Sequence, residues 1–86
     1  MKIYLHRNFK MEYASLSDSH KNKFQERRDL FLQNQSHPLL HNHKLHGKYN
    51  KYRSINITGD LRVIYEPVTK DSVLFIYIGT HSNLYK

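Results

Sequence analysis

The segment from Val73 to Ile78 is the longest apolar run in this chain of 86 residues. Drawn as an extended strand, it carries apolar side chains on both sides, which is typical of a strand inside a sheet that other elements cover. The run is far shorter than the roughly 18 residues of a membrane-spanning segment. We therefore expect it to be the central strand of a sheet that helices cover on at least one face.

Shorter alternating segments predict the neighbours of this strand. Residues 52 to 57 place Ile55 and Ile57 on one side and leave Ser54 and Asn56 on the other. A Thr-Gly-Asp turn follows, and residues 61 to 66 alternate again, which predicts a β-hairpin. Residues 67 to 72 then form a second connection. Residues 2 to 6 also alternate and predict a short first strand.

Two helices are expected between the first strand and the hairpin. Phe9, Tyr13 and Leu16 have the spacing that lines one helical face, with Asn8 as the N-cap and an end near Leu16. A Ser-Asp-Ser break at residues 17 to 19 can cap a second helix that runs to about residue 35. Its predicted buried stripe consists of His20, Phe24, Arg27 and Phe31, widened by Leu30.

The order of these elements, β-α-α-β-β-β, predicts an α+β fold. Two N-terminal helices would pack on one face of a twisted antiparallel sheet of about four strands, in one domain covering residues 1–86. Residues 38 to 50 should form a loop, with a short strand near Leu45, because Pro38 stops the second helix and Gly47 permits a turn.

The charge balance favours a polyanionic partner. Lys and Arg number 14 against 7 Asp and Glu, so the formal net charge is +7. Nucleic acid is favoured over a membrane surface because the basic stretch of residues 21 to 28 offers only Phe24 as an apolar contact. The absence of cysteine excludes disulfides and thiolate metal sites. We expect the protein to work in the cytoplasm.

The C-terminal tail carries residues suited to chemistry. After the apolar strand come Gly79, which permits a sharp turn, and His81, whose side chain exchanges a proton close to neutral pH. His81 as a general acid and His81 as a mere cap of the last turn are both compatible with this pattern.

The tail Gly79-Thr80-His81-Ser82-Asn83-Leu84-Tyr85 resembles the C-terminal signature of the YafQ branch of the RelE-type bacterial toxins. The resemblance extends upstream through residues 43–47, 52–56 and 59–65, and so covers the C-terminal half from Pro38. It implies a RelE-like fold in the toxin of a type II toxin-antitoxin system. Such toxins are ribonucleases that cut mRNA at the ribosome and need neither metal nor cofactor. The implied partners are a cognate antitoxin, mRNA with the ribosome, and operator DNA for the toxin-antitoxin complex.

The resemblance also implies roles for single residues. His81 matches the general acid of the family, and Asp60 matches its essential aspartate, which can accept a proton or hold a histidine in the useful tautomer. His43 matches the first histidine of the motif and is the candidate general base, while an alternative alignment places His37 there. Asn56 stands where relatives often have a further histidine, so it can bind RNA but cannot transfer a proton.

The remaining candidates are cationic or aromatic. Arg62 resembles an arginine of other RelE branches, and a guanidinium there can stabilise charge on a pentacoordinate phosphorane. Tyr85 matches a terminal aromatic residue that can stack on a base. Lys48, Lys51 and Arg53, interleaved with tyrosines, form a candidate phosphate track. A zinc site made by His37, His41, His43 and His46 is disfavoured because no cysteine or carboxylate accompanies them.

Two other functions stay open on the sequence alone. The first is a protein of the RelE/ParE fold that binds and inhibits a target without nuclease activity, as the ParE branch does with gyrase. The second is a plain basic RNA-binding domain.

Overall fold

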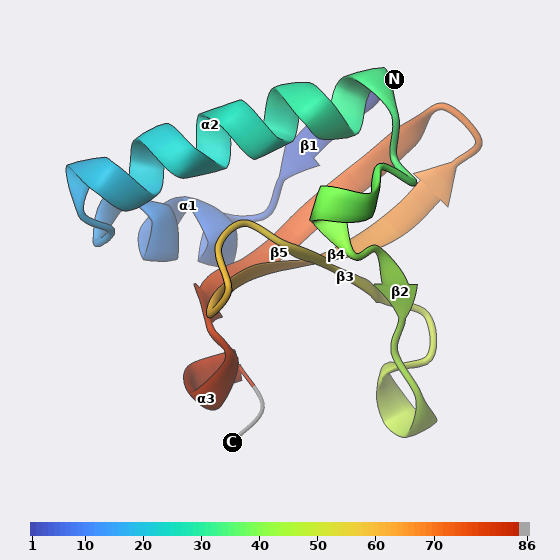
Figure 1. Ribbon diagram of the computed structural model, residues 1–86. Coiled ribbons are helices and arrows are strands. Elements are labelled where there is room, and N and C mark those ends of the chain that lie inside the picture. The colour runs from blue at the N-terminus through green and yellow to red at the C-terminus, as the bar shows by residue number, and fades with distance from the viewer. Residues whose placement is uncertain (85–86) are drawn as a thin grey trace.

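In a computed structural model, which describes residues 1–84, five strands form one sheet in the order β1-β5-β4-β3-β2. The helices α1 and α2 lie together on one face of this sheet (Figure 1). The elements in chain order are β1 (Lys2–Leu5), α1 (Arg7–Ala14), α2 (Asp18–Gln33), η1 (Pro38–Leu40), β2 (His43–Lys44), η2 (Gly47–Tyr49), β3 (Arg53–Asn56), β4 (Leu61–Thr69), β5 (Ser72–Thr80) and α3 (His81–Leu84). The predicted α+β class is confirmed. None of the helices among residues 1–84 has the length and apolar character needed to span a membrane.

The helix caps agree only in part with the sequence prediction. Ser17 caps α2 as expected, because its hydroxyl accepts a hydrogen bond of 3.1 Å from the backbone N–H of His20. The predicted N-cap Asn8 is wrong, since α1 begins at Arg7 and its cap is His6. The Nδ1 atom of His6 accepts the backbone N–H of Asn8 at 3.0 Å, as a shorter polar side chain would do at this position.

Aromatic rings hold the helices on the sheet. Phe75 of β5 is fully buried, and its ring centroid lies 5.7 to 6.1 Å from those of four other rings. Two of these rings come from α2, one from α1 and one from β4: Phe24, Phe31, Phe9 and Tyr65. Tilted and edge-on ring pairs at such separations add to the stabilisation from burial. Phe75 therefore connects every layer of the core.

The predicted four-stranded antiparallel sheet needs two corrections. β1 runs parallel to β5, with Lys2 opposite Ser72 and Leu5 opposite Phe75, because the helices carry the chain back across the sheet before β3 begins. A short fifth strand, β2, pairs with β3 close to the expected position. As a result β4 is the central strand, and β5 lies between it and the edge strand β1.

The predicted connection at residues 67 to 72 is wrong because both strands continue through most of it. β4 extends to Thr69 and β5 begins at Ser72, so only two residues form the turn. Pro67 lies inside β4 opposite Val73, where the strand register shifts. A strand tolerates proline at such an irregularity because its missing N–H then removes no regular ladder bond.

The face of the sheet opposite the helices, called here the open face, is flanked by two projections. α3 follows β5 on one side, and the segment with η2 follows β2 on the other, so both hang below the sheet in Figure 1. Ser54 lies on this face as the alternation predicts, but it is completely buried.

We predict that Phe75→Ala lowers the free energy of unfolding by about 3 to 5 kcal/mol, because the substitution leaves a cavity between all four partner rings. Urea denaturation followed by circular dichroism measures the change. Tyr4→Ala is the matched control, since Tyr4 is 51% exposed on β1 and its loss should cost less than about 1 kcal/mol. Equal losses in the two variants would contradict the role of Phe75.

Candidate functional site

Strand pairing places several of the sequence-predicted residues side by side on the open face. Asn56 of β3 is opposite Arg62 of β4, which is opposite Gly79 of β5. Two residues further along the strands, His43, Ser54, Ile64 and Tyr77 form a second row that crosses β2 to β5. Alternate residues of a strand point to the same face, so the side chains of both rows lie opposite the helices.

Asp60 and His81 meet at one end of this face. Leu61 pairs with Thr80, so the residues just outside the pair are neighbours. The backbone N–H of His81 donates to the backbone oxygen of Asp60 at 3.0 Å and lies 3.4 Å from its Oδ1 atom. Asp60 thus holds the main chain at the start of α3, while the side chain of His81 is exposed.

Three polar atoms on the open face are buried without a hydrogen-bond partner among residues 1–84. They are Oγ of Ser54, Oδ1 of Asn56 and Nε of Arg62. The guanidinium of Arg62 also donates from Nη2 to the backbone oxygen of Gly59 at 3.4 Å. Buried polar groups are normally hydrogen-bonded, so these three atoms would gain a partner wherever water or a ligand reaches them. A guanidinium and an amide are well suited to phosphate and ribose oxygens.

His43 lies on the open face but far from His81. β3 and β4 separate β2 from β5, and strands about 4.8 Å apart put β2 and β5 about 14 Å from each other. The Nδ1 atom of His43 is 2.9 Å from the backbone oxygen of His41. Strand pairing therefore puts Asp60, Arg62 and His81 at neighbouring positions of the backbone, whereas His43 lies on a strand that β3 and β4 separate from β5.

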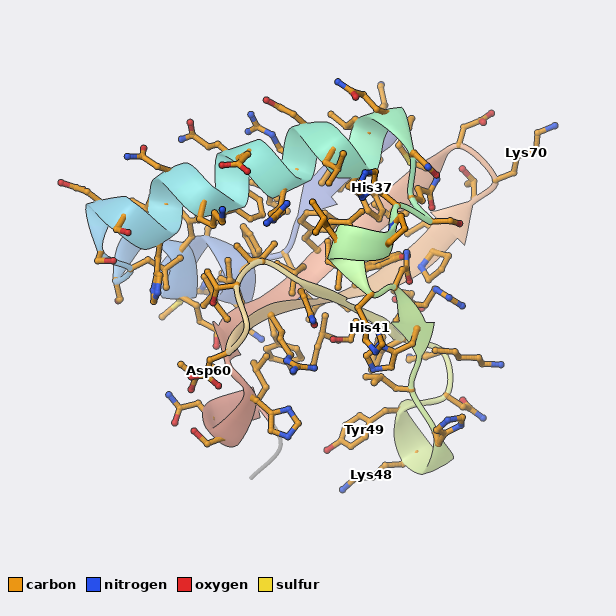
Figure 2. The ribbon with its side chains drawn as sticks, in the orientation of Figure 1. His37, His41, Lys48, Tyr49, Asp60 and Lys70 are labelled. Atoms are coloured by element: carbon orange, nitrogen blue, oxygen red, sulfur yellow. The ribbon has the colours of Figure 1, made fainter. Side chains whose placement is uncertain are left out.

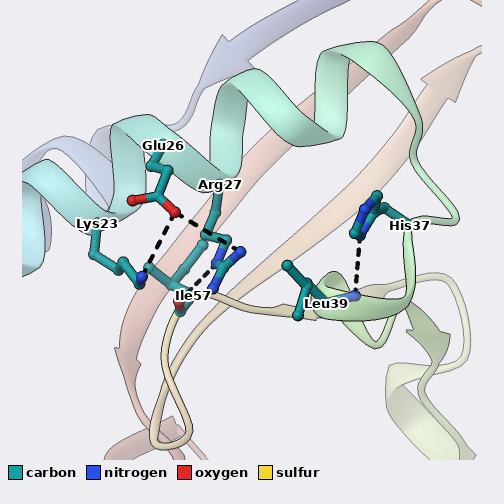
Figure 3. A network of polar contacts seen from close by, with 6 residues as sticks. All are labelled: Lys23, Glu26, Arg27, His37, Leu39 and Ile57. Atoms are coloured by element: carbon teal, nitrogen blue, oxygen red, sulfur yellow. Dashed lines mark hydrogen bonds and ion pairs between the residues drawn. The ribbon is translucent and has the colours of Figure 1, made fainter.

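The alternative residue His37 lies on the side of the sheet that the helices cover (Figure 2). Its Nδ1 atom accepts the backbone N–H of Leu39 at 3.1 Å and caps η1, as Figure 3 shows. On the same side, Arg27 of α2 donates from Nε to the backbone oxygen of Ile57 at 3.3 Å (Figure 3). Arg27 thus links α2 to the end of β3, His37 caps η1, and only His43 of the two candidate histidines lies on the open face.

The predicted phosphate track is divided between the two faces. Lys48 lies with its ammonium 5.2 Å from the ring centroid of Tyr49, and the two project from η2 opposite α3 (Figure 2). Lys51 makes the same contact with Tyr52 at 5.3 Å. Arg53 differs, because its Nε donates to Oδ1 of Asn42 at 2.8 Å, and Asn42 in turn donates to the hydroxyl of the core residue Tyr65.

A pocket of about 250 Å³ lies between the two projections of the open face. Its lining combines apolar, aromatic and polar side chains: Leu45, Tyr49, Tyr52, Ile64, Tyr77, Leu84, Glu12 and Asn83. The sequence prediction missed Glu12 and Tyr77. Tyr77 could have been noticed as a polar-tipped ring within an apolar run, but nothing in the local pattern of α1 marks Glu12.

Two other sequence-based expectations concern the tail and the histidines. Tyr85 lies outside the described residues. The rings of His41 and His43 have centroids 5.3 Å apart, but within residues 1–84 no three His, Asp or Glu side chains form a group that could hold a metal ion.

The fold is shared with several solved toxins. A mutant of YafQ from E. coli superimposes with a TM-score of 0.82 at 21% identity, covering 99% of this chain and 98% of that one. YafQ in the E. coli DinJ-YafQ toxin-antitoxin complex gives 0.75 at 23% identity, with 99% and 97% covered. A copper-bound mutant toxin from Helicobacter pylori gives 0.71 at 25% identity, with 99% of both chains covered. Comparison with curated protein sequences gives no match.

At these sequence identities the structural matches establish the fold but not the family. The family is established by a match to a family model. The model described as the bacterial toxin of the type II toxin-antitoxin system, YafQ, matches residues 1–86. This match covers the N-terminal half as well as the tail and hairpin motifs. The chain therefore belongs to the YafQ family of toxins from bacterial type II toxin-antitoxin systems.

Proposed function

We propose that this toxin is a metal-independent endoribonuclease that cuts mRNA at the ribosome. The observation that carries the proposal is the convergence of Asp60, Arg62 and His81 at one end of the open face. A proton carrier, a carboxylate and a fixed positive charge are the groups that cleavage by a ribose 2′-hydroxyl requires. The formal charge of +7 and the lysines beside this face favour an RNA substrate.

In the proposed reaction the 2′-oxygen attacks the adjacent phosphorus, and the bond from phosphorus to the 5′-oxygen breaks. His81 donates a proton to the departing 5′-oxygen, and Arg62 stabilises the negative charge that grows on the phosphorane. The products are a 2′,3′-cyclic phosphate and a free 5′-hydroxyl. The position of Arg62 opposite Gly79, two residues before His81, supports this role for the guanidinium.

The base that takes the proton from the 2′-hydroxyl must act at the same phosphate as His81. The family resemblance assigns this role to His43, which lies on β2, with β3 and β4 between it and β5. Asp60 is adjacent to His81, so the geometry favours its carboxylate as the proton acceptor. In this version of the proposal, His43 binds RNA further along the open face.

The proposal includes a cognate antitoxin that neutralises the toxin in the cytoplasm, as expected for a toxin of this family. DinJ is the antitoxin in the solved complex with E. coli YafQ. Binding of the joint complex to operator DNA is part of the same proposal.

We predict that His81→Ala lowers the rate of mRNA cleavage by about 10² to 10⁴-fold, the usual contribution of a general acid. Cleavage of mRNA on programmed ribosomes under single-turnover conditions measures the rate. The control is His37→Ala, which removes a histidine from the covered side of the sheet and should leave the rate unchanged. Full activity of His81→Ala would remove the proposed acid.

Product analysis on a free oligonucleotide complements this measurement, since no ribosome needs to be kept intact. Cleavage should continue in excess EDTA and leave a 2′,3′-cyclic phosphate. A 3′-hydroxyl end would indicate metal-activated water instead and would contradict the mechanism.

We predict that Asp60→Asn lowers the saturated cleavage rate by about 10²-fold or more, because an amide cannot take up the proton. The amide oxygen can still accept the backbone N–H of His81, so α3 should keep its position. His43→Ala should instead raise the half-saturating toxin concentration and leave the saturated rate unchanged. If Asp60→Asn is fully active while His43→Ala loses the saturated rate, His43 is the base.

We predict different kinetic effects for Arg62 and Lys48. Arg62→Ala should lower the saturated rate by about 10² to 10³-fold with little change in half-saturation, since it opposes charge that appears only in the transition state. Lys48→Ala should weaken binding and reduce the salt dependence of binding by about one charge. Single-turnover rates measured against toxin concentration separate the two effects. If Arg62→Ala moves only the half-saturation point, Arg62 is a binding residue.

A further inference from the structure

The pocket on the open face has the size and lining of a site for one planar group. Its volume of about 250 Å³ is just below the roughly 300 to 1,000 Å³ of sites that hold a whole drug-sized ligand. Tyrosine rings come to it from three places in the fold: Tyr49 from η2, Tyr52 from the segment before β3, and Tyr77 from β5. Tyr49 is 44% exposed and Tyr77 is 37% exposed, so two rings offer apolar surface to a ligand.

Positive charge accompanies two of these rings. The ammonium of Lys48 lies 5.2 Å from the centroid of Tyr49, and that of Lys51 lies 5.3 Å from the centroid of Tyr52. Aromatic faces that stack bases, with cations nearby that bind the connecting phosphates, are the usual means of binding single-stranded nucleic acid. This combination favours a nucleotide over an uncharged planar ligand.

One side chain of the pocket comes from the helix layer. Glu12 of α1 reaches the edge of β5 beyond Phe75, where β1 no longer pairs with it. Its Oε1 atom accepts the backbone N–H of Ile78 at 3.1 Å and so covers the open edge of the strand. Within residues 1–84 this is the single hydrogen bond of the carboxylate, which leaves the second oxygen available to the pocket.

A carboxylate accepts hydrogen bonds and donates none, so it distinguishes bases by their donors. Adenine, cytosine and guanine present an exocyclic amino group, whereas uracil has carbonyl oxygens in its place and keeps only the ring N3–H as a donor on that edge. Acidic side chains recognise the amino group of cytosine in this way in DNA. Glu12 would therefore favour an amino-bearing base in the pocket and disfavour uracil.

We propose that this pocket binds one base of the RNA substrate, stacked on its tyrosines, and that Glu12 selects a base with an exocyclic amino group. The inference rests on the proposed function, since it identifies a specificity site for the same RNA. It assigns no chemical step to the pocket.

Glu12→Gln tests the selection with little structural change. The amide oxygen of glutamine can accept the N–H of Ile78, and the amide nitrogen then places a donor where the carboxylate had an acceptor. Single-turnover cleavage is measured on mRNAs that carry A, C, G or U at one position at a time around the cut. At one position the wild-type toxin should prefer A or C over U, and Glu12→Gln should shift that ratio at least tenfold towards U.

The matched control is Glu26→Gln, which changes an exposed carboxylate on α2 far from the pocket and should leave every ratio unchanged. If wild-type toxin and Glu12→Gln cleave RNA with the same base preference at every position, the proposal that Glu12 selects the base is wrong. Should Glu12→Gln fail to fold by circular dichroism, Tyr77→Leu takes its place. Tyr77→Leu should then raise the half-saturating toxin concentration for every RNA sequence, because the substitution removes a ring on which the base stacks.

A binding experiment separates this inference from the proposed function. AMP, CMP and UMP are added to the full chain, and the NMR resonances of Tyr49, Tyr52 and Tyr77 are followed. AMP and CMP should move them at lower concentrations than UMP, with the order reversed in Glu12→Gln. This result would support the pocket even if the protein cut no RNA. Resonances that respond to an antitoxin peptide and to no nucleotide would show a protein-binding site and overturn the inference.

Discussion

β4 and β5 pair along almost their whole lengths, from Leu61 opposite Thr80 to Thr69 opposite Ser72. This register puts Asp60 beside His81 and Arg62 beside Gly79, so it decides which side chains meet at the site. A slip by one residue would turn the apolar side chains of a strand to the wrong face. The rings around Phe75 oppose such a slip, because Phe75 fits among them only when it faces the helices. The packing of the core thus maintains the geometry of the site on the other face.

The two faces of the sheet have separate tasks. A chain of this length has apolar residues for one main core, which α1 and α2 complete on one side. The other face carries a mixture of polar, aromatic and apolar side chains, and two short elements flank it, α3 after β5 and η2 after β2. In the proposed function this face binds RNA, because an extended strand of RNA can lie across a shallow surface and contact lysines along its length.

Glu12 joins these two parts of the molecule. Its bond to the N–H of Ile78 satisfies a donor that β1 is too short to reach, and an unprotected edge of this kind can otherwise pair with another chain. The same bond fixes the carboxylate at the border of the pocket between α3 and η2. One side chain therefore covers the edge of the sheet and, in the proposed site, also contacts the base.

The sequence by itself determined the elements and the family. Helical spacing in the first half, alternation in residues 52 to 66 and the apolar run at residues 73 to 78 predicted the helices and the hairpin, and the tail motif indicated the toxin family. The tertiary structure alone decided the parallel pairing of β1, the hydrogen bond between Arg53 and Asn42, the position of β2 with β3 and β4 between it and β5, and the approach of Glu12 to β5. Periodicity reports which side of its own element a residue occupies, because that depends on local backbone geometry. It does not report which distant segment lies opposite, since that choice is made by packing of the whole chain.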